Sequence, residues 1–105
     1  MGCELHVLQT ASDDLSELTP KQREGLIDRH RVLAAKAPEA LQWRGTYRNS
    51  SGRAFIKSRH GRHRCFLLGH YRTCHFRLHT VVLNKDDHMD PREPQLEAKL
   101  RRPGG

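Results

Sequence analysis

Six of the eight histidines in this chain lie between His60 and His88, a stretch that also holds many of its arginines. Histidine gives or takes a proton near neutral pH, and the planar guanidinium group of arginine binds and neutralises phosphate. Cleavage of RNA needs both groups. A base removes the proton of a 2′-hydroxyl, that oxygen attacks the adjacent phosphorus, a cation stabilises the phosphoryl oxygens, and an acid protonates the departing 5′-oxygen. These residue types therefore indicate a ribonuclease chemistry that requires no metal ion and no cofactor.

The charged residues of the central part of the chain, 41–84, are all basic. Between Leu41 and Asn84 there are nine basic residues and no acidic residue, whereas residues 1–40 carry five basic and seven acidic side chains. A stretch of like charges repels itself, and a polyanion relieves that repulsion, so the pattern predicts RNA as a partner. The cations expected to contact RNA are Arg53, Lys57, Arg59, Arg62, Arg72, Arg77 and Lys85.

The same residues also fit a protein that binds RNA without cleaving it. Arginines exposed on an antiparallel sheet can hold a phosphate backbone or an acidic protein while the histidines are only solvated surface residues. A protein that binds double-stranded RNA through backbone contacts is therefore an alternative to the nuclease.

Zinc binding is a third possibility. Cys65, His70, Cys74 and His79 have the spacing C-x4-H-x3-C-x4-H, with His75 as a spare ligand, and four such ligands can hold zinc tetrahedrally. However, the spacing lacks the paired C-x2-C of common zinc sites, and extended strands would separate the ligands.

Length and cysteine content limit the class of protein. A chain of 105 residues fits one domain, here 1–105, with a flexible tail expected from about residue 101. The odd number of cysteines, three, predicts a reducing compartment such as the cytoplasm and argues against a disulfide framework. No apolar run approaches the length that crosses a bilayer, so we expect no membrane partner.

The amino-terminal third predicts a strand followed by helices. Alternation of polar and apolar residues predicts a strand over 4–10, and Ser12 before two aspartates predicts the start of a short helix. Thr19 and Gln22 form a capping box around Pro20, so a helix should run from about 20 to 36.

The rest of the chain predicts strands over about 53–58, 62–68 and 74–83, followed by a short helix over 94–100. Strict alternation in the last strand would place one set of side chains on the face that packs against the helices. This order of elements predicts an α+β fold in which the first strand and a helical hairpin pack on a small antiparallel sheet. The set predicted to face the helices is Cys74, Phe76, Leu78, Thr80 and Val82.

Three segments resemble a known family. Residues 63–67, His-Arg-Cys-Phe-Leu, resemble the arginine-bearing strand of Tyr-Arg-Val-x-Tyr type in the RelE/ParE superfamily of bacterial toxins. Residues 81–88 are similar to the Leu-Asn-x-x-Asp-x-His ending of its HigB-like members, and residues 91–100 resemble their carboxy-terminal helix. The likeness covers most of the chain through short motifs.

The resemblance implies a toxin of a type II toxin–antitoxin system. Such a protein cleaves mRNA in the ribosomal A site and is silenced by a small acidic antitoxin protein. By position in the motifs, Arg64 would stabilise the phosphate, and Asp87 and His88 would act as acid–base or orienting groups, supported by His79 or Lys85. In this chain the aspartate and the histidine are adjacent, whereas the motif separates them by one residue. A branch of the family that inhibits gyrase shares the fold without the nuclease residues.

Overall fold

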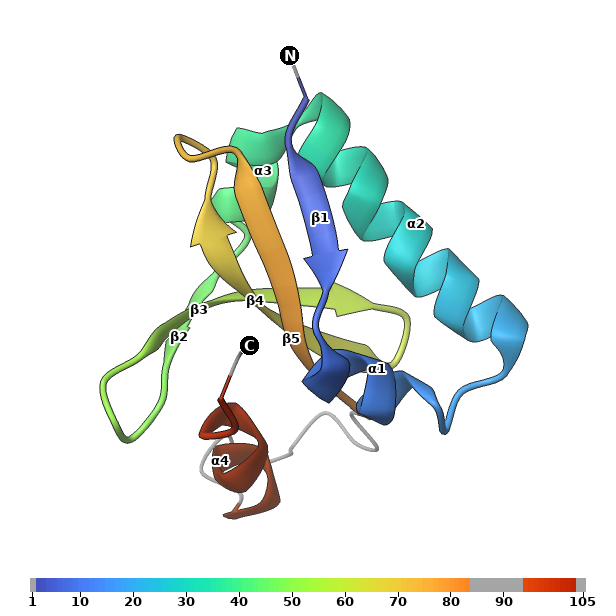
Figure 1. The fold of residues 1–105 in the computed structure, drawn as a ribbon, viewed down its shortest axis with the longest axis vertical. Coiled ribbons are helices and arrows are strands. Elements are labelled where there is room, and N and C mark those ends of the chain that lie inside the picture. The colour runs from blue at the N-terminus through green and yellow to red at the C-terminus, as the bar shows by residue number, and fades with distance from the viewer. Residues whose placement is uncertain (1, 84–93, 104–105) are drawn as a thin grey trace.

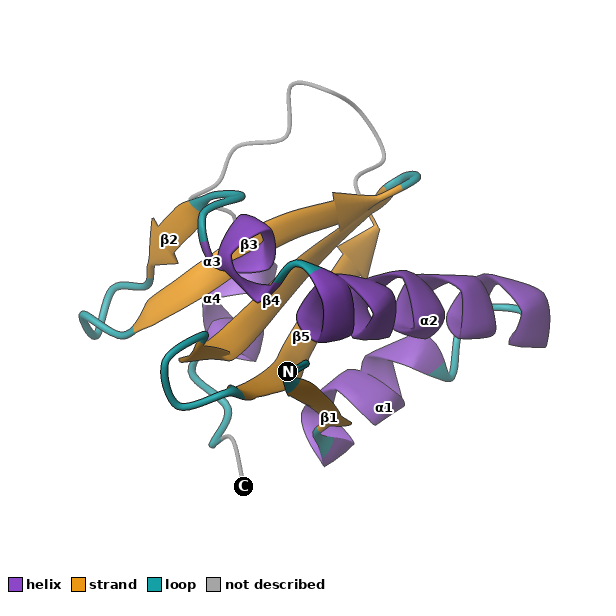
Figure 2. Ribbon diagram, turned by 90° about the horizontal axis from the view of Figure 1, so that it is seen from above, coloured by secondary structure: helices purple, strands orange, loops and turns teal. Residues whose placement is uncertain are grey.

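The structure is a computed structural model that describes residues 2–83 and 94–103. The described residues form an α+β fold, the class that the sequence predicts. The sheet has the order β1-β5-β4-β3-β2 and carries helices on both faces (Figures 1 and 2); it is mixed rather than wholly antiparallel. Strand β1 pairs with β5 in parallel, and the other neighbours are antiparallel. The elements are β1 (Glu4–Val7), α1 (Gln9–Leu15), α2 (Pro20–Lys36), α3 (Pro38–Gln42), β2 (Thr46–Arg48), β3 (Ala54–His60), β4 (His63–His70), β5 (His75–Leu83) and α4 (Pro94–Leu100).

Helix α2 begins and ends where the sequence predicts. The Thr19 hydroxyl accepts a hydrogen bond from the Gln22 backbone N–H, and the Gln22 side chain accepts one from the Thr19 N–H, so the capping box is complete. The helix buries Leu26, His30 and Ala34, which recur every four residues on one face.

The boundary between β1 and α1 lies earlier than expected. The strand ends at Val7 rather than at residue 10, and the helix begins at Gln9 with Leu8 as its N-cap. The Leu8 N–H donates to the carbonyl of Leu78 on β5, which keeps Leu8 extended. Ser12 therefore lies inside the helix instead of capping it.

A β-bulge in β5 overturns the predicted alternation of its side chains. Phe66 pairs with Thr80 and Leu67 pairs with Leu78, which leaves His79 as an extra residue on β5. Because of the extra residue, the side chains of β5 that follow it lie on the face opposite to the predicted one. Phe76, Leu78 and Val81 pack in the core under helices α1 to α3, whereas Val82 packs on the other face against α4.

The described part of the expected tail is held in place. Arg102 donates from Nη1 and Nη2 to the two carboxylate oxygens of Asp14 on α1, at 3.1 and 2.9 Å, and the Val81 N–H donates to the same carboxylate at 2.9 Å. Burial works to raise the pKa of Asp14, but these bonds and the nearby Lys99 outweigh it, so the pKa is lowered. Arg102, the second residue of the expected tail, thus contacts α1 through Asp14, and the flexibility of the tail stays a prediction.

The cysteines also differ from expectation. Cys3 and Cys74 form a disulfide that joins the start of β1 to the turn before β5, so the argument against a disulfide from an odd cysteine count is wrong for this pair. Cys65 remains a free thiol inside the core, where burial raises its pKa to about 12. An odd count leaves one cysteine over but does not prevent the other two from meeting.

Candidate nucleic-acid interface

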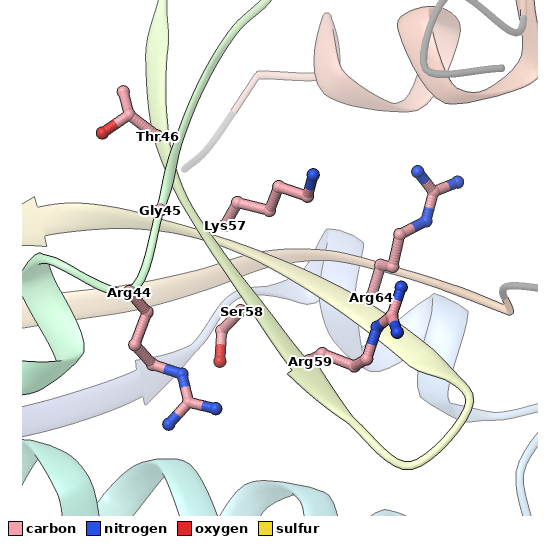
Figure 3. Close-up of a pocket in the computed structure, with 7 residues that line it drawn as sticks. All are labelled: Arg44, Gly45, Thr46, Lys57, Ser58, Arg59 and Arg64. Atoms are coloured by element: carbon pink, nitrogen blue, oxygen red, sulfur yellow. The ribbon is translucent and has the colours of Figure 1, made fainter. Parts of the chain in front are cut away.

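A cavity of about 340 Å³ opens at the edge of the sheet where β2 stops short of the end of β3. The last residue of β3 that pairs with β2 is Ile56, opposite Thr46. One residue further on, the Lys57 N–H donates to the Gly45 carbonyl at 3.0 Å. Beyond that point the backbone of β3 runs along the cavity. Its lining, drawn in Figure 3, is Arg44, Gly45, Thr46, Lys57, Ser58, Arg59 and Arg64.

Three of the lining cations share one face of the sheet. Arg59 and Arg64 are direct cross-strand neighbours, and Lys57 is two residues from Arg59 on β3, so the period of two turns all three side chains the same way. We call Lys57, Arg59 and Arg64 the cationic surface. Lys57 and Arg59 are exposed, whereas Arg64 is only 6% exposed, which places a guanidinium group in a partly dehydrated setting.

Arg44 adds a fourth cation from the other side of β3. Figure 3 shows Arg44 and Ser58 pointing away from Lys57, to the side of the sheet that carries α2, while Lys57 and Arg64 point to the opposite side. None of the described residues that line the cavity is acidic. Like charges gathered at an open sheet edge create a positive potential, which suits the binding of phosphate groups.

Ser58 and His30 form a buried hydrogen-bonded pair at the inner side of the cavity. The His30 Nδ1–H donates to the Leu26 carbonyl at 2.8 Å, so Nε2 carries the lone pair and accepts from the Ser58 hydroxyl at 2.9 Å. Burial lowers the pKa of His30, and Arg44 lowers it further, which favours the neutral ring. Ser58 and His30 are 4% and 1% exposed, so the pair mainly fastens α2 to β3.

The remaining predicted RNA contacts are divided between two locations. Arg62 is exposed in the turn between β3 and β4, next to the cationic surface. The Arg53 guanidinium lies over the Phe55 ring, 5.7 Å from its centroid. Arg72 donates a hydrogen bond to the Tyr71 hydroxyl. Arg77 on β5 pairs with His6 on β1. The structure thus gathers part of the predicted set and leaves Arg53, Arg72 and Arg77 outside the cavity.

His79, one of the predicted catalytic residues, is buried in this fold and does not line the cavity. It is fully buried; its Nε2–H donates to the Arg102 carbonyl at 2.8 Å, and its Nδ1 accepts from the Thr80 hydroxyl at 2.6 Å. Burial lowers the pKa of His79. With both ring nitrogens engaged inside the protein, His79 cannot exchange protons with a ligand at the cavity.

The predicted zinc set does not come together. Cys74 is tied to Cys3 by the disulfide, Cys65 lies in the core under the helices, and His79 lies in contact with Phe55 on the opposite face. A single ion cannot bind ligands on two faces of a sheet, so this zinc site is excluded.

The other proposed catalytic and contact residues, Asp87, His88 and Lys85, lie outside the described residues. The part of β5 that is described ends at Leu83, which pairs with His63, the residue next to Arg64. Leu83, the last described residue of β5, thus lies at the end of the sheet that carries Arg64.

Arg44 and the Ser58–His30 pair belong to the site but were not singled out by the sequence. Arg44 stands near the start of the stretch without acidic residues, so its charge was visible. Its place beside β3 depends on the short strand β2, which no local pattern indicated. Ser58 and His30 are 28 residues apart, and only the packing of α2 on the sheet brings them together.

No helix in the described ranges is both long and apolar enough to span a membrane. Comparison with known proteins gives no family assignment: no protein-family model matches the chain, and no curated protein matches it.

Proposed function

We propose that this protein binds the phosphate backbone of RNA at the cationic surface and cleaves mRNA on the ribosome, as the toxin of a type II toxin–antitoxin pair. The observation that carries the proposal is the gathering of Lys57, Arg59 and Arg64 on one face of an open sheet edge that has no acidic residue in its described lining. Arg44 adds a cation to the same edge from the other face. Backbone phosphates are the ligands that such a set of cations attracts regardless of base sequence.

Arg64 is the proposed stabiliser of charge on the phosphate. Its position on β4, in the middle of the sheet, fixes its backbone, and its low exposure strengthens its interaction with a bound anion. Asp87 and His88 are the proposed acid–base pair. One group accepts the 2′-hydroxyl proton, the 2′-oxygen attacks phosphorus, and the departing 5′-oxygen receives a proton from the other group.

The proposed partner is a small acidic antitoxin protein that neutralises the same cations. The proposed compartment is the cytoplasm, where ribosomes are found. In that reducing setting we expect Cys3 and Cys74 as neighbouring thiols, whereas an oxidising buffer would preserve their disulfide.

The test is message cleavage on translating ribosomes, measured by mapping new 5′ ends. Wild type should cut, and His88→Ala and Arg64→Gln should each lower the cleavage rate by about 100-fold or more, because each removes a group that acts in the transition state. Arg72→Ala, which removes a cation outside the cavity, is the matched control and should cut normally. An inert wild type would overturn the nuclease proposal.

A second candidate function is RNA binding without cleavage. It is favoured by the lining of the cavity, which holds cations but no histidine within the described residues. In that case wild type binds duplex RNA with a steep dependence on salt and leaves both free and ribosome-bound RNA intact.

A further inference from the structure

A cluster of histidine and glutamate lies at the edge of the sheet formed by β1, away from the cationic surface. We propose that Glu4, His6 and His75 bind a Zn²⁺ ion. Each of the three residues offers one ligand atom, and these atoms all lie within 4.8 Å of one another. Two imidazole nitrogens and one carboxylate oxygen are a common ligand set for zinc that leaves one position for water.

The strand geometry explains why these residues meet. Glu4 and His6 are two positions apart on β1, so their side chains leave the same face of the strand. The parallel register places Glu4 beside His75 on the neighbouring strand β5. The His6 and His75 rings stack with centroids 5.2 Å apart. All three side chains are exposed, so a metal ion reaches them from solvent.

The distances are close to those of a metal site. Zinc bonds of about 2.0–2.1 Å in a tetrahedron separate neighbouring ligand atoms by roughly 3.3–3.4 Å. The His6 Nε2 and Glu4 Oε2 atoms are already 3.3 Å apart. The His75 ring nitrogen lies within 4.8 Å of both atoms, so a rotation of this exposed side chain is enough to complete the set.

In the protein with its disulfide formed, the backbone around the cluster is fixed before any metal binds. The Glu4 N–H donates to the Cys74 carbonyl at 3.2 Å, and the Cys3–Cys74 disulfide joins the residues immediately before Glu4 and His75. A site whose backbone is already in place loses less conformational entropy on binding. A bound ion would in turn fasten β1, an edge strand, to β5.

Titration of the protein with Zn²⁺, followed by calorimetry in a buffer without reductant, tests the site. The oxidised disulfide matters because free thiols would bind zinc themselves. We expect one ion per chain, an affinity at least about tenfold weaker in His6→Ala and in His75→Ala, and a smaller loss in Glu4→Gln. His63 lies at the end of β4 that is far from His75, so His63→Ala should bind Zn²⁺ as wild type does.

Thermal unfolding supplies a second readout that separates ligand loss from misfolding. Without metal, His6→Ala and His75→Ala should unfold near the wild-type temperature, because both side chains are exposed. A fixed concentration of Zn²⁺ should raise the midpoint of wild type and of His63→Ala by more than it raises that of His6→Ala or His75→Ala. The proposal is overturned if wild type binds no zinc up to millimolar concentration, or if binding survives unchanged in both histidine variants.

Discussion

Among the described residues, two charged clusters are built in opposite ways. Asp14 has a side chain that is 5% exposed and is surrounded by Arg102, Lys99 and a backbone N–H, so opposite charges meet there and join α1, α4 and β5. The cationic surface instead brings charges of the same sign together on β3 and β4, with no acidic side chain in the described lining of the cavity.

The comparison distinguishes two roles of charged side chains. Those around Asp14 stabilise the folded protein, whereas those of the cationic surface are placed to bind a ligand. Opposite charges in a buried setting favour the folded state when hydrogen bonds satisfy them. Like charges side by side do not stabilise the sheet, but they raise the positive potential where a polyanion can approach. Substitutions in the first cluster should therefore change stability, and substitutions in the second should change RNA affinity.

The largest effect on stability is expected at Asp14. Asp14→Asn leaves Arg102 and Lys99 without their carboxylate partner, so we expect the free energy of unfolding to fall by about 2–4 kcal/mol in urea denaturation. Asp13→Asn is the matched control, because Asp13 is exposed and its carboxylate accepts a hydrogen bond from the Gln9 side chain rather than meeting a cation. If both variants lose the same stability, the contrast between the two clusters fails.

The same carboxylate predicts how stability depends on pH. The pKa of Asp14 is lowered in the folded protein, since its hydrogen bonds and neighbouring cations outweigh the effect of burial. Its contribution is therefore complete above the unfolded value of about 3.9 and is lost as the pH falls through the lower folded pKa. Urea unfolding from pH 7 to pH 2 should show a steeper loss for wild type than for Asp14→Asn. Parallel curves would contradict this assignment.

Ser58 sharpens the comparison because it lines the cavity and yet belongs to the fold. Ser58→Ala leaves the buried Nε2 of His30 without its donor, and we expect a loss of about 1–2 kcal/mol in the free energy of unfolding. RNA affinity at a temperature where the variant is folded should stay within about twofold of wild type, since no charge is lost. Thr46→Ala, an exposed residue of the same lining, should change neither quantity.

Local patterns were sufficient to predict helix α2 and the α+β class. Thr19, Gln22 and the buried stripe from Leu26 to Ala34 lie within one segment, so neighbours in sequence determine the result. The bulge at His79 was not predictable in this way. It depends on how β4 and β5 pair, and on the contacts of the His79 ring with Thr80 and Arg102, which close only in the folded chain.

The candidate site likewise contains residues that local sequence patterns predict and residues that only long-range contacts bring together. Lys57, Arg59 and Arg64 were predictable because charge type and strand period are visible in the sequence. The contribution of Arg44 was not predictable, since it depends on the length of β2. The Cys3–Cys74 disulfide and the parallel pairing of β1 with β5 were missed for a related reason: both join segments about 70 residues apart.

The salt dependence of RNA binding tests the central claim most directly. Affinity for a short single-stranded RNA is measured at several salt concentrations for wild type, Lys57→Ala/Arg59→Ala and Arg72→Ala/Arg77→Ala, two variants that each remove two positive charges. If the cationic surface holds phosphates, the first variant should bind more weakly, and its slope of log affinity against log salt should shrink by about 0.7 per lost contact. The second variant should retain the wild-type slope. Equal losses in both variants, or none in either, would contradict the account.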